Sequence, residues 1–213
     1  MGLHRLHKWI LIMKFLILLV LLLLRFAAVA QQPVVMNGWK HRADTIAVDV
    51  YWYTSGGYGG TNWNNWGIWN SGVQTKANLI RKRDGSNTGF SVALSNNQGG
   101  ADNGTPYCAT PTSGFPTEVY RHTIYMAAPT TLTFTNLDNN KKYDYVHLGS
   151  RNTATHSLQM SSQSQTVAMQ AAFNCSDKMQ INGLVPSSGT IVITVIAVTG
   201  TFTYTNAFYL IEH

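Results

Sequence analysis

Charged side chains are scarce in this sequence, which has 15 Lys and Arg residues and 9 Asp and Glu residues among 213. Four of the basic residues lie within residues 1–30, a segment without acids, so the rest of the chain has a formal net charge of +2 instead of +6. The basic cluster that remains, Arg81-Lys82-Arg83, is too short for a nucleic-acid-binding surface. We therefore expect no nucleic acid among the partners.

Motifs of the common enzyme classes are missing as well. The chain has no G-x-S-x-G, H-E-x-x-H or G-x-x-x-x-G-K pattern. Its two glutamates are Glu118 and Glu212, so the paired acids of a glycoside hydrolase would have to come from scattered carboxylates. No catalytic residue is predicted, and a hydrolase with a non-standard site is the weakest of the alternatives.

Sets of metal-binding residues are also lacking. His147 and His156 alone make a weak metal site. Asp84-Gly85-Ser86-Asn87 has fewer carboxylates than a calcium loop needs, so it is predicted to be a tight turn. We expect no metal and no cofactor, and a structural calcium ion has no motif to support it.

Cysteine occurs only as Cys108 and Cys175. In an oxidising compartment the two would form one disulfide, and closing so long a loop stabilises a fold by about 4 kcal/mol in the chain-entropy model. Two unpaired thiols are the alternative. The sequons Asn103-Gly104-Thr105 and Asn174-Cys175-Ser176 would matter only in a host that glycosylates exported proteins.

A long hydrophobic run occurs once, within residues 1–30, which have the features of a signal peptide. Residues 15–24 are apolar, basic residues precede them, and Ala28-Val29-Ala30 supplies small residues before a cut at Gln31. A spanning helix needs roughly twenty apolar residues, so a retained anchor is the minority alternative. We predict a signal peptide (1–30) and one domain (31–213), secreted to the periplasm or outside, without stable membrane insertion after cleavage.

Thr, Ser, Asn and Gly are abundant, and apolar residues alternate with period two in short segments between turns. No segment after residue 31 has a helical period with caps, so many short strands predict an all-β fold, an antiparallel two-sheet sandwich or a barrel. The segment 190–198 is apolar on both faces, which predicts a central strand, and 99–116 is predicted to be a surface loop. The alternating segments are 46–52, 90–94, 132–134, 145–148, 167–169, 190–198 and 202–211.

Tryptophan is concentrated in one segment, since four of the five beyond residue 30 lie within residues 51–70. Trp52 ends an alternating strand and is expected in the core. The rest of the segment is rich in Gly and Asn, which predicts a loop rather than a regular core element. Rings on such a loop either stack on the apolar faces of sugars or close the end of the core. The candidate rings are Tyr58, Trp63, Trp66 and Trp69.

The second half of the chain contains a recognisable series of short sequence motifs. Asn136-Leu137-Asp138 leads through Lys142-Tyr143 to a strand that ends Leu148-Gly149-Ser150-Arg151, and the last strand contains Tyr204-Thr205-Asn206-Ala207-Phe208. This resembles the galactose-binding-domain-like jelly-roll modules of secreted bacterial proteins. Their corresponding strand ends F-G-S-R, and their last strand reads Y-x-N-A followed by hydrophobic residues. Here His147-Leu148 replaces two aromatic residues of that pattern, and Thr155-His156-Ser157 replaces a second Arg-Thr pair.

The resemblance covers most of residues 31–213 and implies a β-sandwich with jelly-roll topology, similar to carbohydrate-binding modules. The planar guanidinium group of Arg151 either binds a ligand hydroxyl or carboxylate, or donates hydrogen bonds to backbone carbonyls within the fold. We predict a non-catalytic module that binds a glycan or cell-surface polymer. A structural or protein–protein adhesion module of the envelope or matrix, with envelope proteins as partners, is the alternative. The predicted ligand-binding residues are Tyr58, Trp63, Trp66, Trp69 and Arg151.

Overall fold

The structure of the chain, a computed structural model, describes residues 44–52, 60–68, 71–103, 108–153 and 155–213. Within these residues it contains β-strands and one 3-10 helix, η2 (Thr117–Tyr120). The strands are β1 (Thr45–Trp52), β2 (Asn64–Ile68), β3 (Gly72–Lys76), β4 (Ser91–Asp102), β5 (His122–Ala127), β6 (Thr130–Thr135), β7 (Tyr143–Leu148), β8 (Ser157–Ser162), β9 (Gln165–Gln170), β10 (Met179–Leu184), β11 (Ile191–Thr199), β12 (Phe202–Thr205) and β13 (Ala207–Glu212).

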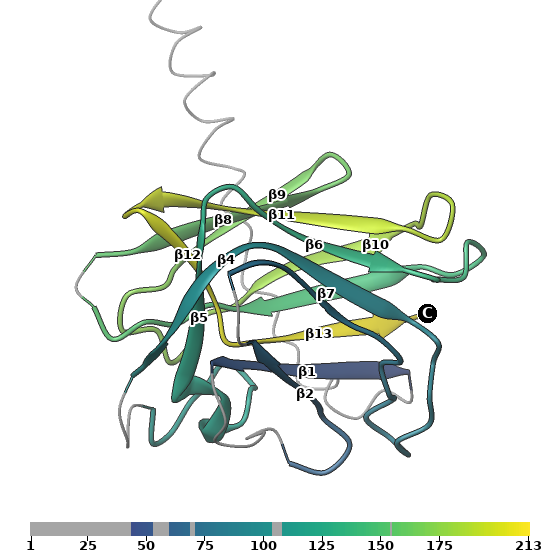
Figure 1. Cartoon of the computed structure of the whole chain (residues 1–213), viewed down its shortest axis with the longest axis horizontal. Coiled ribbons are helices and arrows are strands. Elements are labelled where there is room, and N and C mark those ends of the chain that lie inside the picture. The colour runs from purple at the N-terminus through teal and green to yellow at the C-terminus, as the bar shows by residue number, and fades with distance from the viewer. Residues whose placement is uncertain (1–43, 53–59, 69–70, 104–107, 154) are drawn as a thin grey trace, which may run out of the picture. The chain divides into compact units, whose positions relative to one another are not determined.

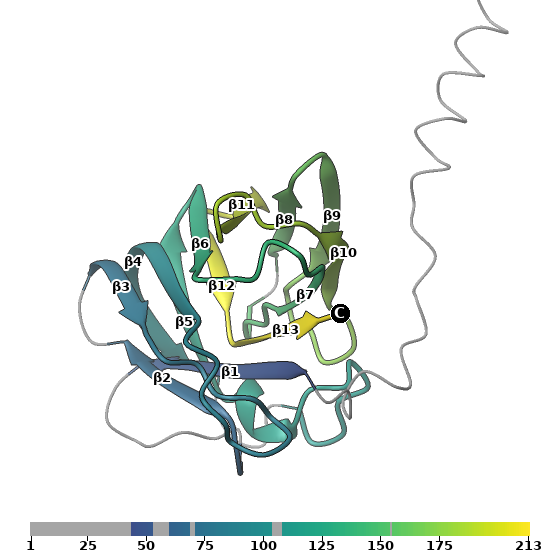
Figure 2. The same ribbon diagram turned by 90° about the vertical axis from the view of Figure 1, so that its right-hand side faces the viewer.

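The strands form two sheets that face one another (Figures 1 and 2). The five-stranded sheet has the order β10-β7-β13-β1-β2, and the eight-stranded sheet has the order β12-β5-β4-β6-β11-β8-β9 with β3 paired to β4. All pairs are antiparallel except β1 with β2, which are parallel. The chain crosses from one sheet to the other after β2, β6, β7, β9, β10 and β12, as in a jelly roll. The predicted two-sheet β-sandwich is confirmed.

The core lies between the sheets and is filled by alternate residues of their strands. Phe134 of β6 packs edge-on against Tyr145 of β7 and Phe208 of β13, with ring centroids 5.6 and 5.7 Å apart. All three side chains are fully buried. The period-two pattern thus gave the inward residues of β1, β4 and β6 correctly, and β11 lies between β6 and β8 as its apolar composition predicted.

Two predicted segments differ from the structure. Residues 202–211 form two strands in different sheets, because the chain changes sheet at Asn206. The predicted loop 99–116 is shorter, since β4 continues to Asp102 and pairs there with β5. Alternation continues through 202–211 and marks no boundary there, whereas residues 99–102 have the Gly-rich composition of a loop although they belong to β4.

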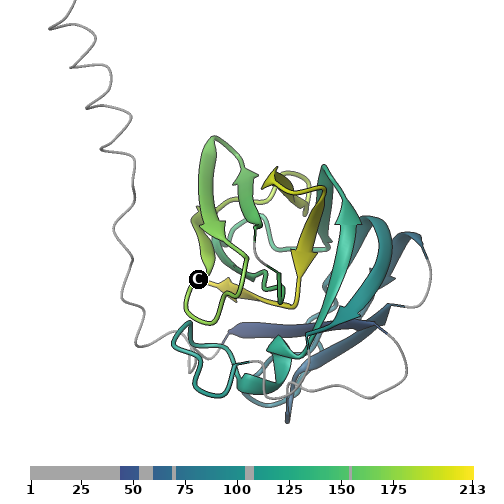
Figure 3. The ribbon, with the colours of Figure 1, turned by 90° about the vertical axis from the view of Figure 1, so that its left-hand side faces the viewer.

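The outer face of the five-stranded sheet is covered by the segment around η2. Phe115 stacks on Tyr209 of β13 at 4.4 Å, and the backbone N–H of Thr112 donates to the carbonyl of Cys175 at 3.0 Å. Cys108 and Cys175 form the predicted disulfide, with Cα atoms 5.7 Å apart. In Figure 3 this segment lies beneath β1 and β13, at the bottom of the view. None of the helices formed by the described residues is long and apolar enough to cross a membrane.

Candidate functional site

The two predicted stacking tryptophans that the structure describes are buried. Trp66 belongs to β2, pairs with Val50 of β1 and is 4% exposed in the core. Trp63 is 6% exposed, and its ring lies 5.4 Å from that of Tyr209 under the ammonium group of Lys82. Neither ring offers a free face, so their assignment to a stacking platform is corrected: Trp66 lies in the core, and Trp63 packs with Tyr209 on the outer face of the five-stranded sheet. Tyr58 and Trp69 lie outside the described residues.

The prediction of a loop was wrong for residues 64–68 because the Asn and Gly residues there serve strand β2. Asn64 is buried, donates to the carbonyls of Ala47 and Ile80, and accepts from the N–H of Ile80. Gly67 lies under the ring of Tyr51, whose nearest atom is 3.1 Å from where a Cβ would stand. These contacts fix the two small polar or Gly positions of β2, while Trp66 and Ile68 pack into the core.

Arg151 follows β7 and joins several segments at one end of the sandwich. Its guanidinium Nη1 donates to the side-chain oxygen of Asn103 at 2.9 Å and approaches the carbonyl of Asp102 at 3.4 Å. Burial raises the pKa of the Tyr204 hydroxyl, and the nearby charge of Arg151 opposes that rise. The predicted bond from Arg151 to backbone within the fold is therefore present. Arg151 is half-buried, and its guanidinium group has five N–H donors. These bonds within the fold are therefore compatible with a role of Arg151 in ligand binding as well.

Phe173 lies beside Arg151 and is the most exposed aromatic ring among the described residues, at 58%. Its backbone has a positive φ of 47°, and its N–H donates to the carbonyl of Arg151 at 2.9 Å. Before Phe173 in the chain, the backbone N–H groups of Ala171 and Ala172 donate to the carbonyl of His156. On the other side Asn174 bonds the carbonyl of Gly149, and Cys175 is fixed by the disulfide. The ring is therefore exposed on a backbone held from both directions.

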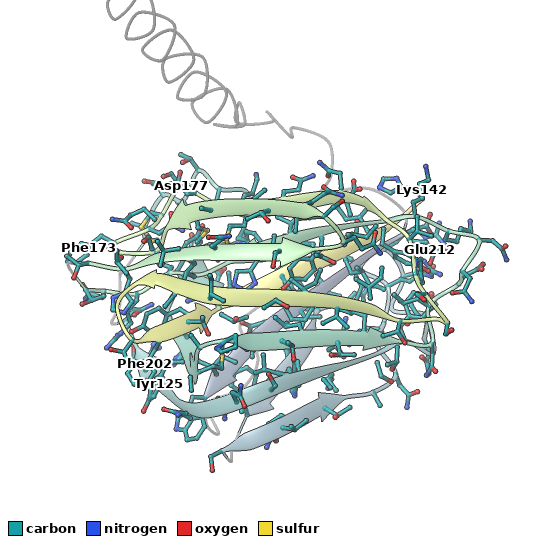
Figure 4. The ribbon with its side chains drawn as sticks, turned by 90° about the horizontal axis from the view of Figure 1, so that it is seen from above. Tyr125, Lys142, Phe173, Asp177, Phe202 and Glu212 are labelled. Atoms are coloured by element: carbon teal, nitrogen blue, oxygen red, sulfur yellow. A yellow bond between two sulfur atoms is a disulfide. The ribbon has the colours of Figure 1, made fainter. Side chains whose placement is uncertain are left out.

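Further aromatic side chains lie at the same end of the molecule. Tyr125 of β5 and Phe202 of β12 are half-buried, with ring centroids 5.1 Å apart, and Figure 4 shows them at the same end as Phe173. The ring of Tyr204 lies 4.8 Å from that of His156 in an edge-on arrangement. We name Arg151, Asn152, His156, Phe173 and Tyr204 the Phe173 site.

Arg151 is the cation of the Phe173 site at neutral pH. Burial lowers the pKa of His156, and the nearby charge of Arg151 lowers it further, which favours the neutral imidazole. Burial also raises the pKa of Tyr204, so its hydroxyl stays protonated. The site thus combines one exposed ring, one guanidinium group and neutral hydrogen-bonding groups. Such a surface suits an uncharged polyol or a weakly anionic ligand.

Sequence reasoning identified Arg151 but missed Phe173, Tyr125 and Phe202. Phe173 stands in the Gln170–Asn174 turn, where no apolar alternation distinguishes an exposed ring from a buried one. The signal that could have been used is its position two residues before Cys175, since a disulfide fixes the neighbouring backbone.

Other predicted features have structural roles. Asp84 and Ser86 form the expected tight turn, in which the Ser86 N–H donates to the carboxylate of Asp84 at 2.9 Å. Both sequon asparagines, Asn103 and Asn174, are buried and bonded to backbone, so neither side chain is open to glycosylation. The described residues contain no group of three or more His, Cys, Asp or Glu that could hold a metal ion.

No protein-family model and no curated protein matches the chain. Similar solved structures include a β-glucuronidase and a carbohydrate-binding module. A β-glucuronidase from Bacteroides uniformis has 8% sequence identity and a TM-score of 0.40, with 71% of this chain and 20% of the enzyme covered. TmCBM61, solved in complex with β-1,4-galactotriose, has 11% identity and a TM-score of 0.31, with 66% of this chain and 88% of that chain covered. This chain spans about a fifth of the enzyme's length. With TM-scores below 0.5, function has to be inferred from the chain's own residues.

Proposed function

We propose that this protein is an exported, non-catalytic module that binds a glycan at the Phe173 site. The observation that carries the proposal is the 58% exposure of Phe173 on a backbone held by Arg151, His156 and the disulfide. A large apolar ring exposed on a rigid loop is costly to leave in water and is typical of binding surfaces.

The chemistry of the site fits a sugar. One face of a pyranose ring carries C–H groups and packs on an aromatic plane, while its hydroxyls need hydrogen-bond partners. Phe173 provides the plane, and the fork of Arg151 and the exposed amide of Asn152 provide donors beside it. Because the backbone is already ordered, binding does not carry the entropic cost of fixing a loop.

The proposed location outside the cytoplasm rests on two features. Residues 1–30 have the pattern of a signal peptide, although they lie outside the described residues. The Cys108–Cys175 disulfide is of the kind that persists in oxidising compartments. Together they support secretion to the periplasm or the cell exterior.

The test is a glycan array followed by affinity measurement on each glycan that binds. Phe173→Ala should weaken binding by about tenfold or more, which corresponds to about 1.4 kcal/mol, and Phe173→Trp should retain it. Val185→Ala is the matched control, because Val185 is also exposed, at 44%, but lies in the turn before β11. Equal binding by wild type and Phe173→Ala would contradict the Phe173 site.

Tyr58 and Trp69 stay candidates for the same function and are tested on the same array. If Tyr58→Ala or Trp69→Ala abolishes binding while Phe173→Ala does not, the glycan site lies on the 58–69 segment, with Arg151 as a structural residue. Release of shorter sugars from a bound glycan would instead favour the hydrolase alternative. An array without any bound glycan would contradict glycan binding.

A structural or protein–protein adhesion module is the second candidate. It is favoured by a separate observation, the exposed apolar side chains of β11: Val192 at 44%, Ile196 at 36% and Val198 at 55%.

A further inference from the structure

The outer face of the eight-stranded sheet is free of charged side chains. On β11 the outward residues Val192, Ile196 and Val198 are exposed, and on β3 Val73 is 69% exposed. These are four of the six exposed large hydrophobic residues among those the structure describes. We name as the bare face the outward residues of six strands: 73 and 75 of β3, 91, 93 and 95 of β4, 131, 133 and 135 of β6, 192, 194, 196 and 198 of β11, 157, 159 and 161 of β8, and 166, 168 and 170 of β9.

The bare face consists of Ser, Thr, Gln, Ala, Val and Ile alone. Strand register aligns these residues in rows across the sheet. Thr75, Ala93, Thr133 and Val192 lie side by side in one row. In Figure 4 the six strands are seen from this side, adjacent to one another across the view. The side chains are short, so another flat surface could approach closely.

The outer face of the five-stranded sheet, unlike the bare face, is covered. There the outward residues Ala47, Val146 and Tyr209 are buried, and Phe115 covers the last of them. An apolar sheet face normally packs against another layer. The bare face has exposed β-branched residues on a central strand, yet no described segment of the chain covers it.

We propose that the bare face binds the bare face of a second copy of this chain, giving a reversible dimer. Lipid headgroups and polyanions would need Lys or Arg, and sugars would need aromatic rings; the bare face has neither. In a twofold dimer each surface meets its own copy, so a charged face would repel itself, whereas a neutral one does not. Two neutral sheet faces with short side chains can pack about 10 Å apart.

The area of the bare face indicates how strong this dimer is. Six strands about 4.8 Å apart and about six residues long at roughly 3.3 Å each give a footprint of roughly 500 Å² per copy. The dimer would bury on the order of 1,000 Å² in total, near the lower limit for specific interfaces. We therefore expect micromolar association rather than an obligate dimer.

The test is sedimentation velocity on the full chain, in the form its host produces, from about 1 to about 500 µM. The weight-average mass should rise from monomer towards dimer across this range. Val192→Glu places a charge at the centre of the bare face and should weaken association by about tenfold or more, because two like charges would be buried together. Val185→Glu is the matched control, since Val185 and Val192 are both 44% exposed but Val185 lies off the bare face.

A wild-type chain that stays monomeric at about 500 µM would overturn the proposal, and a different partner would then occupy the face. Equal weakening by Val185→Glu and Val192→Glu would also overturn it, as would a Val192→Glu chain that dimerises like wild type. If Val192→Glu lowers the melting temperature, Thr133→Lys on the neighbouring strand replaces it. Glycan binding by Val192→Glu should match wild type, so the test is independent of the Phe173 site.

Discussion

At the scale of single residues, His147 is the clearest pH-sensitive group. It lies on the inner face of β7 and is fully buried. The Tyr145 hydroxyl donates to its Nδ1 at 3.0 Å, and its Nε2–H donates to the carbonyl of Tyr204 at 3.1 Å. Both bonds are made by one neutral tautomer. Burial lowers the pKa of His147 from 6.5 to about 4.

The free energy of unfolding should therefore fall as pH is lowered from about 6.5 to about 4. In this window the unfolded chain binds a proton at His147 and the folded chain does not, so acid favours unfolding. The loss is about 3 kcal/mol across the window. Urea unfolding at several pH values measures it.

The control for this prediction is His147→Gln, which keeps a polar side chain but cannot take up a proton. It should show a smaller loss of stability with acid than wild type. His156→Gln should retain most of the loss, because His156 is only partly buried. A wild-type free energy that stays constant between pH 6.5 and 4, or an unchanged slope in His147→Gln, would show that His147 titrates normally.

At the scale of secondary-structure elements, Asn206 makes the junction between β12 and β13. Its side-chain oxygen accepts from the N–H of Ser150 at 2.7 Å, and its amide donates to the carbonyl of His122 at 2.8 Å. Asn206→Ala would leave the buried N–H of Ser150 and the part-buried carbonyl of His122 without this partner. The free energy of unfolding should fall by about 3 kcal/mol, since each such group costs about 1–3 kcal/mol.

A matched control is Asn139→Ala, because Asn139 also bonds a backbone N–H, that of Gly189, but is exposed. It should lose less than about 1 kcal/mol in the same denaturation experiment. If the two variants unfold at the same urea concentration, the bonds of Asn206 do not hold the junction.

The same elements show what the sequence could predict. Alternation located the inward residues of β1, β4 and β6, because burial on one face of a strand imposes period two. It could not locate the sheet change at Asn206, because apolar and polar residues go on alternating through this position. It also missed β2, where Asn64 and Gly67 make strand contacts that composition assigns to a loop. The exposure of Phe173 depends on tertiary bonds that no local pattern encodes.

At the scale of the whole molecule, the two sheet faces differ because one is tied to a covering segment. The disulfide joins Cys108 of that segment to Cys175, two residues beyond Phe173, across a sequence separation of 67. It therefore connects the cover of the five-stranded sheet to the proposed glycan site. Among the described residues, no such segment covers the bare face.

Replacing both cysteines by alanine should lower the free energy of unfolding by about 4 kcal/mol, because the open loop gains entropy in the unfolded chain. The same change should weaken glycan binding through Phe173, since one side of its turn is released while the bond to the Arg151 carbonyl remains. Dimerisation through the bare face should be unchanged, because neither cysteine belongs to that face and its strands stay paired with one another. Urea unfolding, affinity for a bound glycan and sedimentation velocity measure the three quantities on one variant. A variant that loses dimerisation but keeps its glycan affinity would reverse the assignment of the two surfaces.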